Sequence, residues 1–99
     1  MISVLIPAYN EAGNLTPLLQ KLARAFEANH LEGEVVLIDD GSTDATGVEA
    51  DMLAVEYPFL HVIHQRRNRG LTEALKAGFR VVQGDPILFL PADLESDPE

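Results

Sequence analysis

The chain has 99 residues, enough for one domain with a hydrophobic core, and 46% of its residues are hydrophobic, as in an ordinary folded protein. Its formal net charge of −9 argues against a nucleic-acid backbone as the partner, and its lack of cysteine excludes disulfides and thiolate metal sites. It carries no apolar run near the ~18 residues that a membrane helix needs and no features of a signal peptide, so we expect a cytoplasmic location.

The apolar pattern alternates along the chain between strand and helix. Residues 2–6 form a short apolar run closed by a proline, which predicts a strand. Apolar residues then recur at helical spacing over residues 15–26, with Asn14 or Thr16 as the N-cap. Residues 34–39 are β-branched and apolar, which predicts a buried strand.

A second helix is expected next, capped by Thr43 or Asp44 and running through Val48, Met52 and Val55. It ends before the proline that follows, because the residue before a proline disfavours helical geometry.

The rest of the chain repeats the alternation. Residues 60–65 predict a third strand, and residues 71–82 carry the apolar stripe of a third helix that Gly84 ends. Residues 86–90 predict a fourth strand. This βαβαβαβ order predicts an α/β fold of three layers, a Rossmann-like α/β/α arrangement around a parallel sheet.

Polar residues gather at the ends of three predicted strands, in residues 7–11, 39–44 and 91–95. The carboxyl ends of parallel strands meet at one edge of a sheet, so the three clusters together predict a nucleotide site. Acidic side chains two positions apart at a strand end can hold a divalent cation against a phosphate. Because the net charge is negative, a phosphorylated ligand would have to be attracted locally, by helix N-termini, a bound cation, or arginines 66, 67 and 69.

Each cluster also has a purely structural interpretation. Residues 7–14 are compatible with a simple strand-to-helix turn, and residues 39–42 with turn and cap chemistry. A turn needs only one carboxylate, however, and two adjacent carboxylates repel, which favours function for the second cluster. The histidines, His30, His61 and His64, lack metal-ligand spacing, and structural roles are favoured for them.

Other nucleotide and catalytic motifs are absent from the sequence. There is no G-x-G-x-x-G after the first strand, which disfavours a dinucleotide-binding Rossmann domain, and no G-x-x-x-x-G-K-[ST] phosphate loop. The acidic stretches do not fit the calcium-binding loop pattern, and there is no G-x-S-x-G nucleophile elbow.

Taken together, these residues resemble the family 2 glycosyltransferases, inverting enzymes of the GT-A fold, and most closely the dolichol- and polyprenyl-phosphate sugar transferases. The resemblance covers essentially the whole chain and is carried by residues 3–11, 36–44, 68–70, 74–79 and 84–94. It implies a nucleoside-diphosphate sugar donor, UDP- or GDP-linked, and a lipid-phosphate or saccharide acceptor.

The resemblance also implies that residues 1–99 are the nucleotide-sugar-binding half of a glycosyltransferase domain. The acceptor site and the general base are expected in a missing half, so no catalytic residue is expected here, and the chain would bind a nucleotide without completing transfer. In the full-length protein the cytoplasmic face of a membrane is the implied location.

Nucleotide-binding residues follow position by position from the family motifs. The proline, tyrosine and glutamate that line the base and ribose pocket in such enzymes correspond to Pro7, Tyr9 and Glu11. Asp40 would hydrogen-bond the base or the ribose, with Ile38 packing nearby.

Further residues would complete the site. Arg69, Gly70 and Lys76 would lie near the nucleotide, and Ala92 and Asp93 belong to an element similar to the D-x-D motif of the family.

The same element would hold the metal. Asp93 and Glu95 are expected to hold Mg²⁺ or Mn²⁺ on the diphosphate, where the cation neutralises the leaving group. The family usually has Asp-Ala-Asp where this chain has Pro91-Ala92-Asp93, so one carboxylate is missing. Magnesium needs only one or two carboxylates besides phosphate and water, so a site remains feasible.

Two alternatives and one assembly state accompany this interpretation. A receiver-like signalling domain has an acidic pair similar to Asp39 and Asp40, but that pair is expected near the first strand rather than after the second. The third interpretation is a remnant that only binds a nucleotide or a partner. The edge of the fourth strand, left uncovered, would favour a homo-oligomer.

Overall fold

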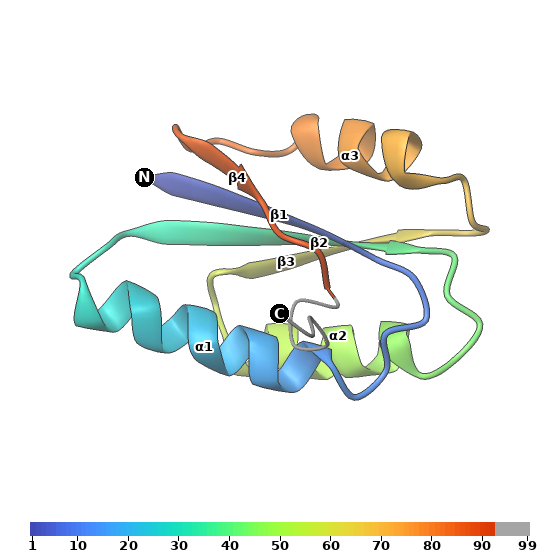
Figure 1. Ribbon diagram of the computed structural model, residues 1–99, viewed down its shortest axis with the longest axis horizontal. Helices are drawn as coiled ribbons and strands as arrows, with labels where there is room; N and C mark the ends of the chain where they lie inside the picture. The colour runs from blue at the N-terminus through green and yellow to red at the C-terminus, as the bar shows by residue number, and fades with distance from the viewer. Residues whose placement is uncertain (93–99) are drawn as a thin grey trace, which may run out of the picture.

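Helices cover both faces of a parallel sheet in the computed structural model, which describes residues 1–92 (Figure 1). The order of elements predicted from the sequence is confirmed. In chain order the elements are β1 (Ile2–Ala8), α1 (Leu15–Ala28), β2 (Gly33–Asp40), α2 (Thr46–Glu56), β3 (Leu60–Gln65), α3 (Leu71–Phe79) and β4 (Ile87–Phe89).

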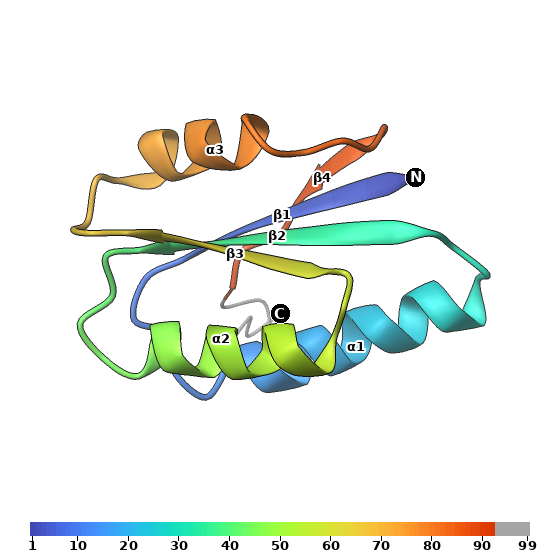
Figure 2. The ribbon, with the colours of Figure 1, turned by 180° about the vertical axis from the view of Figure 1, so that it is seen from behind.

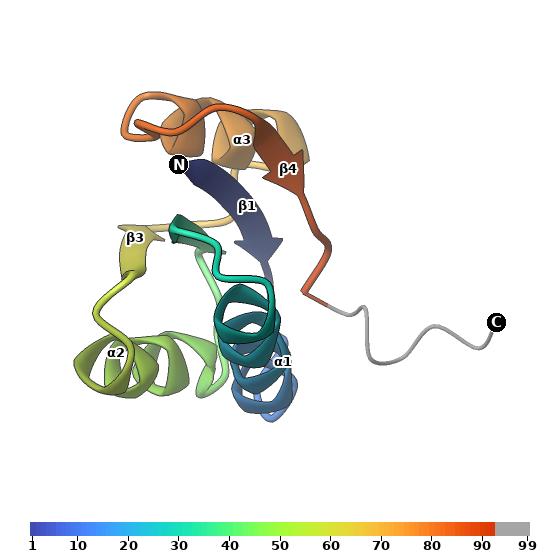
Figure 3. The same cartoon turned by 90° about the vertical axis from the view of Figure 1, so that its left-hand side faces the viewer.

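The strands lie in the order β3-β2-β1-β4, and all neighbouring pairs are parallel. Helices α1 and α2 cover one face and α3 covers the other, which gives the predicted three layers (Figures 1 and 2). The view in Figure 3 shows β4 beside β1, with α3 on the opposite side from α1 and α2. Because the strands all point the same way, their following segments leave from one edge of the sheet, here called the carboxyl rim.

Two apolar clusters, one on each face, hold the layers together. The larger lies between the sheet and helices α1 and α2, and includes the buried Leu18 and Leu19. The smaller lies under α3, around Leu5 and Ile38. Burial of one such side chain contributes about 1.5–3 kcal/mol, so the larger cluster supplies most of the packing energy. Gly78 lets α3 approach closely, since a Cβ there would lie 2.8 Å from Leu5 Cδ2.

Strand β1 is longer than predicted and runs through Pro7 to Ala8. Ser3 N and Leu5 O both form hydrogen bonds with the β4 segment. Because the backbone groups of alternate strand residues face the same neighbour, the backbone nitrogen of residue 7 also faces the β4 side. β4 pairs with β1 only as far as Leu5, and Pro7 therefore lies beyond its end. No hydrogen-bond donor is required there, which is why a proline fits within the strand.

Helix α3 is shorter than predicted and ends at Phe79, although the apolar stripe was expected to reach Val82. The N–H groups of Val81 and Val82 both donate to Gly78 O, at 3.1 and 3.2 Å, so the chain leaves the helix in a tight turn. Val82 still packs against the smaller cluster, which explains why the sequence pattern continued past the helix end.

The apolar residues from which helix α2 was predicted point away from the core. Val48, Met52 and Val55 are 64%, 69% and 87% exposed, whereas Ala50 and Leu53 are buried. Both sets have helical spacing, so periodicity alone could not distinguish the buried face from the exposed one.

A carboxylate from α2 replaces the cap predicted for α1. Asn14 occupies the N-cap position but makes no side-chain cap bond, and Thr16 lies inside the helix. Glu49 instead accepts hydrogen bonds from two N–H groups at the start of α1, at 2.7 and 2.9 Å.

At the start of α2 the N-cap residue is Ala45, which makes no side-chain cap bond, so the cap predicted at Thr43 or Asp44 is wrong. Asp44 lies one residue earlier and accepts from Thr46 N at 2.9 Å.

Among the described residues, no helix is both long enough and apolar enough to cross a membrane.

Candidate functional site

The β1–α1 and β2–α2 loops are tied together at the carboxyl rim. Asn10 N donates to Ser42 Oγ at 3.0 Å, and Thr43 N donates to Asn10 Oδ1 at 2.8 Å. Glu11 N donates to Thr46 Oγ1 at 2.8 Å. Polar residues of the second sequence cluster therefore hold the loop that carries the first one.

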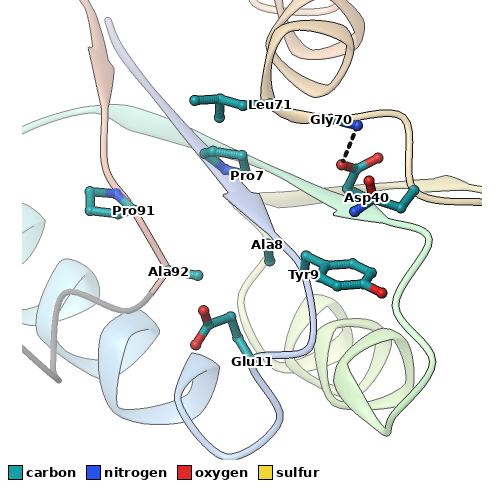
Figure 4. Close-up of a pocket in the computed structure, with 10 residues that line it drawn as sticks. Pro7, Ala8, Tyr9, Glu11, Asp40, Gly70, Leu71, Pro91 and Ala92 are labelled. Carbon is teal, nitrogen blue, oxygen red and sulfur yellow. Dashed lines mark hydrogen bonds between the residues drawn. The ribbon is translucent and has the colours of Figure 1, made fainter.

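A cavity of about 270 Å³, here called the rim cavity, opens beside these loops (Figure 4). Its walls come from the end of β1, the end of β2, the start of α3 and the segment after β4. The lining residues are Pro7, Ala8, Tyr9, Glu11, Asp40, Asn68, Gly70, Leu71, Pro91 and Ala92. In Figure 4, Tyr9 and Asp40 lie on one side of the cavity, with Pro91 and Ala92 on the other. Small-molecule sites measure roughly 300–1,000 Å³, so the rim cavity can hold part of a nucleotide sugar.

Asp40 organises one wall of the rim cavity and is only 4% exposed. Its Oδ1 accepts from Arg69 N and Gln65 Nε2, both at 2.9 Å, and its Oδ2 accepts from Gly70 N at 3.0 Å (Figure 4). Hydrogen bonds to a charged group contribute about 1.5–3 kcal/mol each, so this carboxylate fixes the β3–α3 loop firmly.

Gly41 permits the β2–α2 loop to lie against the β3–α3 loop. Its φ of +71° is a backbone conformation that suits glycine. A Cβ there would lie 2.1 Å from the backbone carbon of Arg67, closer than any side chain tolerates. At Gly41 the two loops therefore approach through their backbones.

Asp39, the neighbour of Asp40, faces α2. Its carboxylate accepts from Ser42 N at 3.1 Å and lies 2.9 Å from His64 Nδ1, while His64 Nε2 lies 2.8 Å from Asp51. Burial raises the pKa of Asp39, but hydrogen bonds from Ser42 and His64 outweigh it and hold the pKa below the ordinary 3.8. Hydrogen bonds to Asp51 and then Asp39 raise the pKa of His64 above 6.5, against the effect of burial.

Six of the ten residues predicted to bind a nucleotide meet at the rim cavity. They are Pro7, Tyr9, Glu11, Asp40, Gly70 and Ala92.

Three other predicted residues lie elsewhere. Ile38 is fully buried under α3, and Lys76 lies on α3 with its Nζ 3.5 Å from Glu73. Arg69 lines a separate cavity beside β3. These three residues come from β2, from α3 and from the β3–α3 loop, so sequence position near a motif did not by itself place a side chain at the cavity.

Four residues line the rim cavity that were not assigned to the site from the sequence: Ala8, Asn68, Leu71 and Pro91. Each is a chain neighbour of a predicted residue, which was the available signal. Leu71 was assigned to the apolar stripe of the third helix but is 62% exposed; it is the first residue of α3 and lines the rim cavity.

The predicted metal ligands Asp93 and Glu95 lie outside the described residues. Within residues 1–92, no group of three histidine, aspartate or glutamate side chains is arranged to hold a metal ion. The metal site thus stays a prediction from the sequence.

Comparison with known proteins identifies the family. The family model for glycosyl transferase family 2 matches residues 3–99. The chain belongs to this family. The resemblance predicted from the motifs is thereby confirmed.

Curated relatives of this family 2 chain act on polyprenyl or dolichol phosphates, according to their names. The undecaprenyl-phosphate 4-deoxy-4-formamido-L-arabinose transferase of Aeromonas hydrophila is 41% identical over 100 residues, which cover 100% of this chain and 31% of the relative. The dolichol-phosphate mannosyltransferase of Pyrococcus furiosus is 38% identical over 98 residues, covering 99% of this chain and 27% of the relative. This chain thus spans less than a third of the length of these relatives.

Solved structures of glycosyltransferases share the fold. S. aureus TarS 1–349 in complex with UDP-GlcNAc is 31% identical with a TM-score of 0.79, covering 93% of this chain and 26% of that one. The mannosyltransferase PcManGT from Pyrobaculum calidifontis, in complex with GDP-Man and Mn²⁺, is 29% identical with a TM-score of 0.78, covering 93% of this chain and 27% of that one. These neighbours have the GT-A fold, so the predicted fold class is confirmed.

Proposed function

We propose that this family 2 chain binds the nucleoside-diphosphate sugar donor of a glycosyltransferase in the rim cavity. The observation that carries the proposal is the meeting of three separate family motifs around one cavity, at residues 7–11, 40 and 91–92. The UDP- and GDP-linked sugars named with the structural neighbours support a donor of this chemical class.

Within the rim cavity, we propose that the base and ribose lie between Tyr9 and Asp40. Tyr9 is 44% exposed, so its ring is available to stack on a base. Asp40 can accept further hydrogen bonds, since a carboxylate has about four lone-pair sites and three are used. Glu11, which a 2.7 Å hydrogen bond from Asn14 Nδ2 orients, lines the same cavity.

We propose that Asp93 and Glu95 hold Mg²⁺ or Mn²⁺ on the diphosphate. Asp93 follows Ala92, a cavity-lining residue, by one peptide bond, and carboxylate oxygens are the ligands that these cations prefer. When bound, the cation would neutralise charge on the leaving diphosphate. The Mn²⁺ named with PcManGT supports this assignment.

The acceptor proposed for the whole enzyme is a polyprenyl or dolichyl phosphate, as the names of the relatives suggest. A saccharide acceptor is the alternative that the family resemblance implies. The enzyme would then act at a membrane surface, on its cytoplasmic face. We place acceptor binding and the general base in the part of those relatives that this chain does not match, so that this chain binds the donor without completing transfer.

Calorimetric titration with UDP, GDP, ADP and CDP, each with and without Mn²⁺, tests the proposal. We expect one of these nucleotides to bind with a stoichiometry near one and more tightly with Mn²⁺. The absence of binding by all four would reject a donor site in the rim cavity.

A homo-oligomer through the edge of β4 remains our proposal for assembly. Leu88 and Phe89 on this short strand are 45% and 50% exposed, and Phe89 contacts the half-exposed Phe79 with ring centroids 5.5 Å apart. Pairing of β4 with a second copy would cover this apolar surface and the edge of β4 that pairs with no strand among residues 1–92. Light scattering that finds only monomer at high micromolar concentration would reject the oligomer.

A further inference from the structure

A second cavity lies beside the exposed strand β3, separate from the rim cavity. Its volume is about 440 Å³, and its lining residues are Ile63, His64, Gln65, Arg66, Arg67 and Arg69. None of these residues lines the rim cavity. The loop between β3 and α3 contributes residues to both cavities, and the second cavity is here called the arginine pocket.

The arginine pocket concentrates positive charge in an acidic protein. The whole chain has only seven lysines and arginines and a formal net charge of −9. Three of those seven residues line this one cavity, and no carboxylate lines it. An anion approaching the protein would therefore be repelled over most of the surface and attracted here.

The three arginines have no acidic partner among residues 1–92. No ion pair joins Arg66, Arg67 or Arg69 to a described carboxylate. Two carboxylates that contact residues 64–70 are already engaged, because Asp40 accepts from the loop backbone and Asp39 lies 2.9 Å from His64 Nδ1. The guanidinium groups are thus left with unused donors.

The backbone that carries these arginines is fixed before any ligand arrives. Asp40 accepts from Arg69 N and Gly70 N, and the β2–α2 loop contacts the backbone at Arg67. A held backbone reduces the ordering that binding must impose on the loop.

We infer that the arginine pocket is a binding site for a phosphate group, distinct from the nucleotide site of the rim cavity. Guanidinium groups bind phosphate oxygens through paired N–H donors, and clusters of arginine are the usual means of phosphate recognition. Free phosphate and the headgroup of an anionic phospholipid share this chemistry. The inference does not depend on the rim cavity binding a donor.

Site-resolved NMR with inorganic phosphate tests this assignment, at constant ionic strength maintained with NaCl. We expect phosphate to shift the amide signals of residues 63–69 in a saturable manner. The double variant Arg66→Gln/Arg67→Gln should weaken this binding at least about tenfold, because two charge-assisted contacts are removed. Arg24→Gln, on the exposed face of α1, is the matched control and should leave phosphate affinity unchanged.

Vesicles identify the source of the phosphate group. Co-sedimentation with phosphatidylglycerol vesicles but not phosphatidylcholine vesicles, lost in the double variant, would identify a lipid headgroup, and phosphate binding without sedimentation would identify a soluble ligand. No shift at residues 63–69, an equal shift in the double variant, or shifts confined to the rim cavity would overturn the site.

The same variants separate this site from the proposed donor site. The double variant should bind the nucleotide that the wild type prefers with affinity within about twofold, since neither arginine lines the rim cavity. If the wild-type protein binds phosphate in the arginine pocket but no nucleotide, the donor proposal fails and the phosphate site stands.

Discussion

The two faces of the sheet use the adjacent carboxylates at the end of β2 in different ways. On the α2 face, Asp39 binds His64 and Ser42 and takes no part in lining the rim cavity. On the α3 face, Asp40 lines the cavity and holds the loop that leads to Gly70. Adjacent aspartates at a strand end can therefore have different roles, because one carboxylate stabilises the framework and the other lines the cavity.

The largest effect on the site is expected from Asp40→Asn. The amide offers one acceptor and presents an NH₂ group where three donors now converge, so donors of the β3–α3 loop are left unpaired. We expect nucleotide affinity to fall by about 1–3 kcal/mol, as measured by calorimetry. Equal affinity in the variant and the wild type would remove Asp40 from the site.

Asp39→Asn makes the same chemical change one residue away, on the other face of the sheet. We expect the free energy of unfolding in urea to fall by about 1–2 kcal/mol, as the hydrogen bonds to Ser42 and His64 weaken. Nucleotide affinity should stay within about twofold of the wild type, since the side chain faces α2. A loss of affinity as large as that of Asp40→Asn would contradict the division between the two faces.

Pro91→Asp tests the opposite wall of the rim cavity from Asp40. It restores the carboxylate that the family usually has at this position, and we expect Mn²⁺-dependent nucleotide affinity to rise by up to about tenfold. Pro58→Asp, an equal change at an exposed position before β3, is the control and should have no effect. If Mn²⁺ changes binding in neither Pro91→Asp nor the wild type, the cation site at Asp93 and Glu95 is wrong.

The sequence predicted the framework of this site well, for a simple physical reason. The different periods of strands and helices identify the elements, and the carboxyl ends of parallel strands lie at one edge of the sheet. The location of Tyr9, Asp40 and Ala92 at the same rim could therefore be predicted without knowledge of any contact. Family resemblance then assigned roles to them.

The partners of individual side chains could not be predicted in this way. Glu49 caps α1 across 33 residues of sequence to Thr16, a contact that only the packing of α1 against α2 creates. The exposure of Val48 on α2 could not be predicted from the sequence either, since the helix is apolar on two faces. The division between Asp39 and Asp40 depends on which strand face meets which helix, and residues three to thirty positions away decide it.

The smallest expected effect is a pH dependence confined to the α2 face. The pKa of His64 lies above 6.5 in the folded protein, because Asp51 and Asp39 stabilise the imidazolium. Its stabilising contribution is therefore fully present below pH 6.5 and is lost as the pH rises through the raised pKa. The effect is small because the side chains of His64 and Asp51 are 43% and 62% exposed, where solvent and salt screen the charges.

Urea unfolding of the wild type and of His64→Gln between pH 5.5 and 8.5 measures this contribution, as the difference between the two slopes of unfolding free energy against pH. This range brackets the ordinary histidine pKa of about 6.5. The wild type should lose stability relative to His64→Gln as the pH rises, and nucleotide affinity of the two proteins should stay parallel because His64 does not line the rim cavity. Identical slopes would show that the Asp39–His64–Asp51 contacts carry no net charge stabilisation. A parallel change in nucleotide affinity would instead show that the α2 face is coupled to the rim cavity, and the two faces would then have to be treated as one unit.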